Sequence, residues 1–128
     1  DIGIALDVTI ATDYPGGAND VILGNEPCLM VYDSSMVGHV GLRKFFMDVA
    51  EMEKIPYQLS YLKRGGTDAG RIHLTRSGCP SIAICLPARY IHSHTTIIHE
   101  DDYLNACLLV EKVISLLDGK AADNIIYG

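Results

Sequence analysis

The first ten residues alternate between large apolar and smaller side chains, which is the pattern of a β-strand. Every second residue over 2–10 is large and apolar: Ile2, Ile4, Leu6, Val8 and Ile10. The opposite face carries small residues, which predicts that another element packs closely against it. Asp7 is the exception, a carboxylate near the C-terminal end of that face. A strand with this many apolar residues is typical of the centre of a sheet.

Helical and strand patterns alternate over the next part of the chain. Proline, glycine and asparagine predict a loop over 13–20, and a short apolar run predicts a strand over 28–32. Apolar residues recur at helical spacing over 40–54, which predicts an amphipathic helix that ends before Pro56. A third strand is predicted over 57–62.

A short helix and a buried strand are predicted next. Thr67 or Asp68 is expected to cap a helix that runs through residue 77 and stops at Gly78. Residues 81–86 are apolar on both faces, as in a central strand that is covered on both sides. Pro87 is expected to end this strand, and residues 89–99 are irregular and polar.

The last predicted helix begins near Asp101 and Asp102, which are favoured at the positive end of the helix dipole. Gly119 is expected just after its end, followed by a short extension. The apolar stripe that we expect this helix to bury consists of Tyr103, Cys107, Val110, Ile114 and Leu117.

This order of elements predicts an α/β fold with helices on both faces of one sheet. The predicted strands and helices would cover such a sheet only in part, and the first strand has nothing before it. The chain also lacks an initiator methionine and enters a strand at once. From these features we expect a piece from within a longer protein.

Composition narrows the class of protein. The chain has 128 residues, of which 48% are hydrophobic and 20% charged, a balance that excludes intrinsic disorder. The net charge of −6 and the lack of a basic cluster argue against nucleic-acid binding. No apolar stretch is long enough for a membrane span, so we expect a cytoplasmic protein with no membrane partner.

The four cysteines are Cys28, Cys79, Cys85 and Cys107. None has the C-x-x-C spacing of a zinc knuckle or a redox motif. Each lies in an apolar context, which favours small buried side chains in a reducing compartment. A disulfide is the alternative.

Three segments could carry chemistry. A buried carboxylate at Asp7 would be costly unless it were bound to a metal or held by hydrogen bonds, and the residues alone leave both open. His92 and His94 follow the 81–86 strand, at the sheet edge where α/β proteins bind ligands, and are either zinc ligands or surface histidines. The glycine-rich run over 65–70 either approaches a ligand closely or is an ordinary strand-to-helix turn. Loop serines at 34–35 lack the elbow motif of serine hydrolases.

Taken together and in this order, these segments resemble the C-terminal half of the catalytic domain of tetrahedral, co-catalytic metallo-aminopeptidases. That family includes glutamyl and deblocking aminopeptidases and proteins labelled cellulase M or endoglucanase. The resemblance covers nearly the whole chain. It rests on these strings: Ala5-Leu6-Asp7-Val8-Thr9, Ala11-Thr12-Asp13-Tyr14-Pro15-Gly16, Ile55-Pro56-Tyr57-Gln58, Gly65-Gly66-Thr67-Asp68-Ala69-Gly70, Gly78-Cys79-Pro80-Ser81 and Pro87-Ala88-Arg89-Tyr90-Ile91-His92-Ser93.

The resemblance implies roles for individual residues. Asp7 matches the carboxylate bound to one metal ion, and His92 matches the histidine bound to the other. Gly66, Thr67 and Asp68 are expected to border the substrate cleft without a catalytic role. His94 stands where relatives usually have proline, and we expect a spectator, with an extra ligand as the alternative. The bridging Asp and the general-base Glu of the family have no counterpart in this chain, so it holds no catalytic residue of its own.

The resemblance also implies a function. The expected fold is a three-layer α/β/α arrangement with a mixed, mainly parallel sheet, like that of zinc exopeptidases, and residues 1–128 form the C-terminal portion of its catalytic domain. The parent enzyme would hydrolyse N-terminal peptide bonds as a homo-oligomer, through water activated by two divalent ions, Zn²⁺ or else Co²⁺ or Mn²⁺. The chain alone would be inactive. The alternatives are a non-catalytic assembly module that binds no metal, and a glycan hydrolase.

Overall fold

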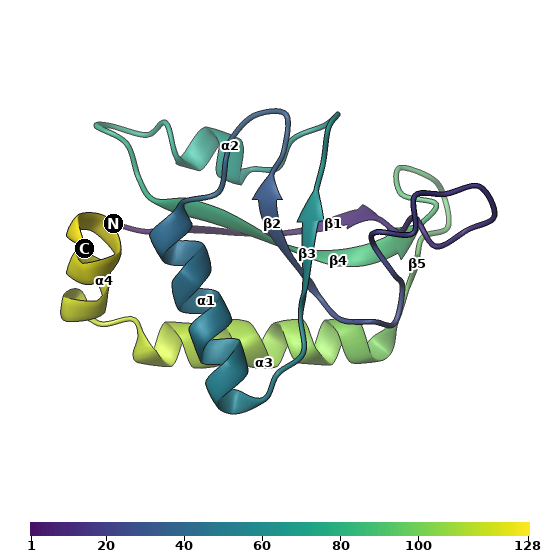
Figure 1. Ribbon diagram of the computed structural model, residues 1–128. Coiled ribbons are helices and arrows are strands. Elements are labelled where there is room, and N and C mark those ends of the chain that lie inside the picture. Colours follow the sequence, from purple (N-terminus) through teal and green to yellow (C-terminus); the bar gives the residue numbers. More distant parts are fainter.

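The computed structural model describes residues 1–128 and consists of a mixed sheet with helices (Figure 1). The elements in chain order are β1 (Gly3–Ile10), β2 (Cys28–Tyr32), α1 (Val40–Glu53), β3 (Gln58–Tyr61), α2 (Ala69–Ile72), β4 (Ser81–Arg89), β5 (Ile97–Ile98), α3 (Glu100–Leu116) and α4 (Gly119–Tyr127). The predicted α/β class is confirmed, and most predicted elements lie within two residues of their observed ends.

The sheet has the strand order β1-β4-β2-β3, with β5 paired to the end of β4. The β1–β4 and β2–β3 pairs are parallel, and the β2–β4 and β4–β5 pairs are antiparallel. Only β4 pairs with β1, so β1 is an edge strand here. The expectation of a central first strand is therefore wrong for this structure. The strand β1 has the apolar pattern of a central strand, but it pairs with one neighbouring strand and not with two.

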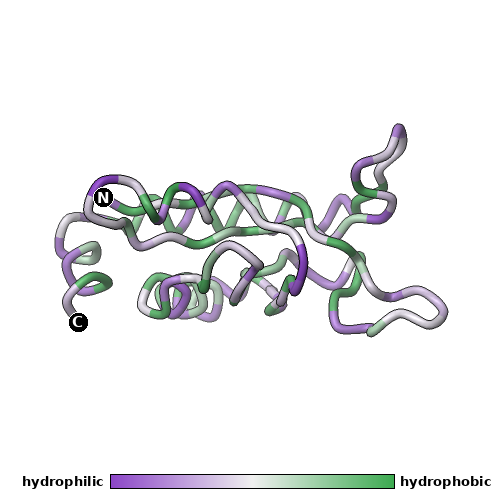
Figure 2. Tube along the Cα trace, turned by 90° about the horizontal axis from the view of Figure 1, so that it is seen from above, coloured by the Kyte–Doolittle hydropathy of each residue, from purple (hydrophilic) through white to green (hydrophobic).

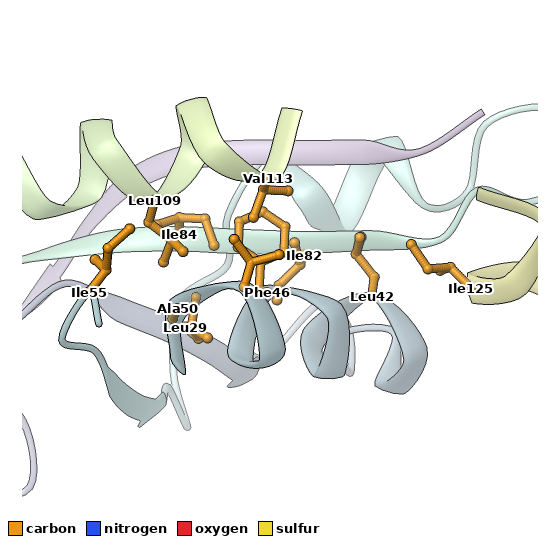
Figure 3. Close-up of a cluster of buried hydrophobic side chains, with 11 residues drawn as sticks. Leu29, Leu42, Phe46, Ala50, Ile55, Ile82, Ile84, Leu109, Val113 and Ile125 are labelled. Atoms are coloured by element: carbon orange, nitrogen blue, oxygen red, sulfur yellow. The ribbon is translucent and has the colours of Figure 1, made fainter. Parts of the chain in front are cut away.

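Helices cover both faces of the sheet, as predicted. On one face, α1 and α3 meet over alternate residues of β4, with Phe46 packed between Ile82 and Val113 (Figure 3). Ile125 of α4 closes the end of this cluster. On the other face, α2 packs over the small residues of β1 and β4, and a Cβ on Gly3 would meet Ile72. The predicted close packing against the small face of β1 is confirmed.

The expected buried stripe of α3 is wrong for Tyr103, Cys107 and Ile114, whereas Val110 and Leu117 are half-buried against the core. The buried residues of α3 are Asp102, Ala106, Leu109 and Val113. The predicted stripe lies on an adjacent side of the helix, where the side chains of Tyr103 and Ile114 are 51% and 59% exposed. The helix thus has two apolar faces, and a pattern of period 3.6 does not say which one meets the core.

Two further predictions about helix ends are wrong. The helix expected through residue 77 ends at Ile72, and Arg76 beyond it has a φ of 54°. Asp68, one of the two predicted cap residues, is the N-cap residue of α2, but its side chain makes no cap bond. The residues after Gly119 form α4 instead of a plain extension, with Asp118 as the N-cap that accepts from the amide of Ala121.

Pro87 does not end β4, which continues to Arg89. At position 87 only β1 flanks the strand, because β2 pairs with β4 at Ile84 and Cys85 whereas β5 pairs at Ala88 and Arg89. One side of the strand therefore needs no ladder hydrogen bond there, which is the setting in which a sheet tolerates proline.

All four cysteines are free. Cys28 and Cys85 are buried opposite each other on β2 and β4. Burial raises the pKa of the Cys28 thiol to about 12 and raises that of Cys85 as well. Cys79 is half-buried and Cys107 is exposed, so the expectation of four buried thiols is wrong for Cys107.

The loops that follow β1 and β4 leave the sheet at one end of the molecule, and the two chain termini lie at the opposite end (Figures 1 and 2). Figure 2 shows that hydrophilic residues gather in these loops, whereas the strands behind them are largely hydrophobic. The candidate site lies at this end of the sheet, where β1 and β4 end.

Candidate functional site

Asp7 lies on β1, three residues before the end of that strand, and its side chain is exposed. Its Oδ1 accepts a hydrogen bond of 2.7 Å from the amide of Val8, and no bond reaches Oδ2. The hypothesis of a costly buried carboxylate does not apply, because the burial of Gly3, Ala5 and Thr9 on the same face does not extend to Asp7. One carboxylate oxygen is free to bind a cation.

His92 lies in the loop between β4 and β5, three residues beyond the end of β4, and is exposed. Its φ is 58°, and that of Tyr90 is 59°, a left-handed conformation that only a minority of non-glycine residues adopt. The imidazole makes no hydrogen bond, so both ring nitrogens are available. His94 lies exposed on the same loop, and His99 instead accepts from the amide of Asp101 at the start of α3.

In the parallel register of β1 and β4, Asp7 lies opposite Cys85, four residues before the end of β4. His92 lies three residues beyond that end, so both candidate ligands lie toward the C-terminal ends of adjacent strands without being paired by the register. An exposed carboxylate and a free imidazole are donors that suit zinc and similar divalent ions. However, no group of three or more His, Cys, Asp and Glu residues could hold a metal ion. Asp7 and His92 therefore do not form a complete metal site by themselves.

The glycine-rich turn is held by a buried aspartate that the sequence did not single out. Asp33 is 5% exposed, and its Oδ2 accepts from the amide and the hydroxyl of Thr67 over 2.9 and 2.8 Å. Its Oδ1 accepts from the amide and hydroxyl of Ser35 and from the amide of Met36. Burial alone would raise the pKa of this carboxyl, but the bonds from Ser35 and Thr67 bring the pKa below its usual value.

Ser35 also fills the space beside two glycines of the turn. A Cβ on Gly66 would lie 2.8 Å from Ser35 Oγ, and one on Gly70 would lie 2.6 Å from Ser35 Cβ. Of the three expected cleft residues, Gly66 and Asp68 are exposed and Thr67 is buried with its hydroxyl bonded to Asp33. Asp68 thus presents the charged group on this turn.

Two other contacts of functional interest were missed from the sequence. Arg89, the last residue of β4, and Asp13, in the loop after β1, form an ion pair of 2.9 Å. Asp102, 1% exposed, accepts from the amides of Gly24 and Glu26, each over 2.8 Å, and so ties the start of α3 to the loop before β2. The string Asp33-Ser34-Ser35 is typical of a turn in which side chains bond to the nearby backbone, so the local bonds of Asp33 could have been predicted. The Arg89–Asp13 contact could not, because nothing in the sequence indicates that residues 76 positions apart meet.

An apolar groove of about 600 Å³ lies between β1 and α3, and Asp7 is at its edge. Nine of the eleven lining residues are hydrophobic. They include Leu6 and Val8 of β1, and from α3 the face that was expected to be buried. The groove and the open edge of β1 together expose a long apolar strip on one side of the sheet.

Comparisons with known proteins bear on this geometry. The M42 glutamyl aminopeptidase family model matches residues 1–109. A glutamyl aminopeptidase of Lactococcus lactis is 38% identical over 92% of this chain and 33% of its own length. The solved TET aminopeptidase of a marine sediment archaeon of the Thaumarchaeota is 42% identical, with a TM-score of 0.94 over 98% of this chain and 36% of its own.

A third likeness is one of fold only. The TET1 peptidase of Pyrococcus horikoshii, described as assembling into a tetrahedron or a large octahedral shell, is 24% identical, with a TM-score of 0.71 over 87% of this chain and 32% of its own. The chain spans about a third of the length of the relatives it matches. No helix is long and apolar enough to cross a membrane. The chain belongs to the M42 glutamyl aminopeptidase family.

Proposed function

We propose that this chain is the C-terminal portion of the catalytic domain of a metal-dependent aminopeptidase that removes N-terminal residues from peptides. The observation that carries the proposal is that a free carboxylate, Asp7, and a free imidazole, His92, lie toward and just beyond the C-terminal ends of two adjacent parallel strands. The family match and the polar character of this end of the sheet support it.

In this proposal Asp7 binds one divalent ion and His92 binds the other. Two such ions, when bound, polarise the scissile carbonyl and lower the pKa of the attacking water. The chain's own contribution is to supply one ligand for each ion. Asp68, on the turn held by Asp33, contributes a negative group at the border of the cleft. Such a charge would attract the protonated N-terminus of a peptide substrate.

The exposed apolar strip supports the proposal that further segments of the parent protein pack on this chain. Strands with open edges and grooves lined by hydrophobic residues are covered in stable soluble proteins. Here the groove runs along the strand that bears Asp7, so a segment covering it would also lie beside the candidate ligand. The bridging ligand and the general base would come from such a segment.

We further propose that the parent enzyme is a cytoplasmic homo-oligomer that acts on peptides with Zn²⁺, Co²⁺ or Mn²⁺. The tetrahedral and octahedral assemblies described for the Pyrococcus horikoshii peptidase support the oligomer, as does the TET name of the thaumarchaeal relative. The chain by itself is inactive in this proposal, because it supplies too few ligands for a tight site.

The test is a peptidase assay on the product of the complete reading frame. Release of free amino acids from unblocked peptides is measured with each of the three metals, for the wild type and for Asp7→Asn and His92→Ala. We expect hydrolysis by the wild type and a loss of at least about a hundredfold in each variant, since each removes a metal ligand. Asp123→Asn, at an exposed position on α4, is the matched control. No release with any metal, or release of reducing sugar from a glucan instead, would defeat the proposal.

A further inference from the structure

A partly buried ion pair joins the loop that follows β1 to the end of β4. Nη2 of Arg89 donates to Oδ2 of Asp13 over 2.9 Å, and the two side chains are 36% and 16% exposed. Arg89 is the last residue of β4, and Asp13 lies three residues beyond the end of β1. The pair therefore ties the loop that continues the Asp7 strand to the base of the loop that carries His92.

The loop over 90–96 is anchored at its base and bent in the middle. Ala88 and Arg89 pair with Ile98 and Ile97 across the short β4–β5 ladder. Between these anchors, Tyr90 and His92 both have positive φ, a conformation that persists in such residues only where the surrounding structure holds it. Within the loop, the hydroxyls of Ser93 and Thr96 donate to the carbonyl of Tyr90. The position of the His92 side chain thus depends on these bonds and on what fixes the base of the loop.

The ion pair consists of one charge-assisted hydrogen bond. Oδ1 of Asp13 and Nε of Arg89 are both buried and have no hydrogen-bond partner within the chain. The contact joins the segment after β1 to the last residue of β4, so breaking it removes a direct connection between the two.

We propose that Asp13 and Arg89 are positioning residues that hold the 90–96 loop so that the His92 imidazole stays at a fixed place relative to the Asp7 carboxylate. Asp7 is already fixed by the β1–β4 ladder, whereas His92 lies outside any ladder. The proposal that this ion pair orders the loop does not depend on the proposed function, and only its link to metal binding rests on that function.

The first test measures backbone ¹⁵N order parameters of residues 91–95 in the chain and in Asp13→Asn, Arg89→Gln and Arg89→Lys. We expect values near about 0.85 in the wild type and below about 0.6 in the Asn and Gln variants. Arg89→Lys should restore much of the order, because only one nitrogen of Arg89 is used. The control is Asp48→Asn, which breaks the exposed pair with Lys44 and should change nothing in this loop.

Unchanged order in both the Asn and Gln variants would overturn the proposal, as would a loss of order throughout the chain, which indicates general destabilisation. The second test is a zinc titration by calorimetry on the metal-free product of the complete reading frame, with His92→Ala as the reference. We expect Asp13→Asn to weaken His92-dependent zinc binding by about tenfold or more. Unchanged zinc affinity in a variant with a disordered loop would refute positioning of the ligand. If the wild type and His92→Ala bind zinc equally, the metal assignment in the proposed function fails, and the order parameters alone decide the positioning.

Discussion

Replacing Asp33 with asparagine tests whether the glycine-rich turn is held by a buried carboxylate. In the most favourable orientation, the amide oxygen keeps the three bonds from Ser35 and Met36, and the amide nitrogen faces Thr67. The Thr67 hydroxyl can rotate to accept from that nitrogen, but the Thr67 amide is left without an acceptor.

An unsatisfied buried amide costs about 1–3 kcal/mol, and the remaining bonds lose the strength that a charged acceptor gives them. We therefore expect Asp33→Asn to lower the free energy of unfolding by about 3 kcal/mol. For a chain of this size the melting temperature should fall by about 10 °C. Thermal and urea unfolding at one fixed protein concentration measure both quantities.

The matched control is Asp68→Asn, in the same turn, because Asp68 is exposed and its side chain makes no cap bond. It should change the free energy of unfolding by no more than about 0.5 kcal/mol. A loss below about 1 kcal/mol in Asp33→Asn, or equal losses in both variants, would refute the reasoning.

The pH dependence of stability gives a second readout of the same residue. The pKa of Asp33 is lower in the folded chain than its usual value. A depressed folded pKa stabilises the fold above the unfolded pKa, which is about 3.9, and this stabilisation is lost as the pH falls from there through the folded pKa. The stability gap between the wild type and Asp33→Asn should therefore be constant from about pH 6 to 8 and shrink below about pH 4.

Three further outcomes are expected. Gly70→Ala should lower the free energy of unfolding, measured in urea, by about 1–3 kcal/mol, because the added methyl group would crowd Ser35. The control Gly119→Ala should be neutral, because no atom lies within 4 Å of the added methyl group. Equal effects of the two substitutions would contradict this packing. A thiol reagent should modify Cys107 in the folded chain and reach Cys28 only on unfolding, and rapid modification of Cys28 would show that the β2–β4 core opens. Light scattering should show concentration-dependent association through the groove and the open edge of β1, and a clean monomer at every concentration would contradict it.

Much of the fold follows from local pattern. The period-two alternation in β1 and the helical spacing in α1 placed both elements to within two residues, since each pattern reflects burial on one side of a single element. The prediction of the buried face of α3 failed in part because such a pattern is informative only when an element is apolar on one side. With two apolar faces on one helix, only the tertiary contacts of Leu109 and Val113 decide which face is buried.

Within the site, the sequence could predict only those residues that lie in a characteristic local string. Asp7 and His92 were proposed from the strings around them, and their role as metal ligands stays a prediction. The Asp13–Arg89 pair could not be proposed, because it joins the loop after β1 to the end of β4, whose proximity follows from the pairing of these two strands. Parallel pairing between distant strands leaves no local mark in a sequence. Asp33 gave a turn signal, but its bonds to Thr67 depend on how the turn packs.

The central claim is that this chain supplies one ligand to each of two metal ions. The most direct test is the zinc content of the purified product of the complete reading frame, measured by mass spectrometry for the wild type, Asp7→Ala and His92→Ala. We predict about two zinc ions per wild-type subunit and a loss of about one or more in each variant. Zinc content that neither substitution changes would contradict the account.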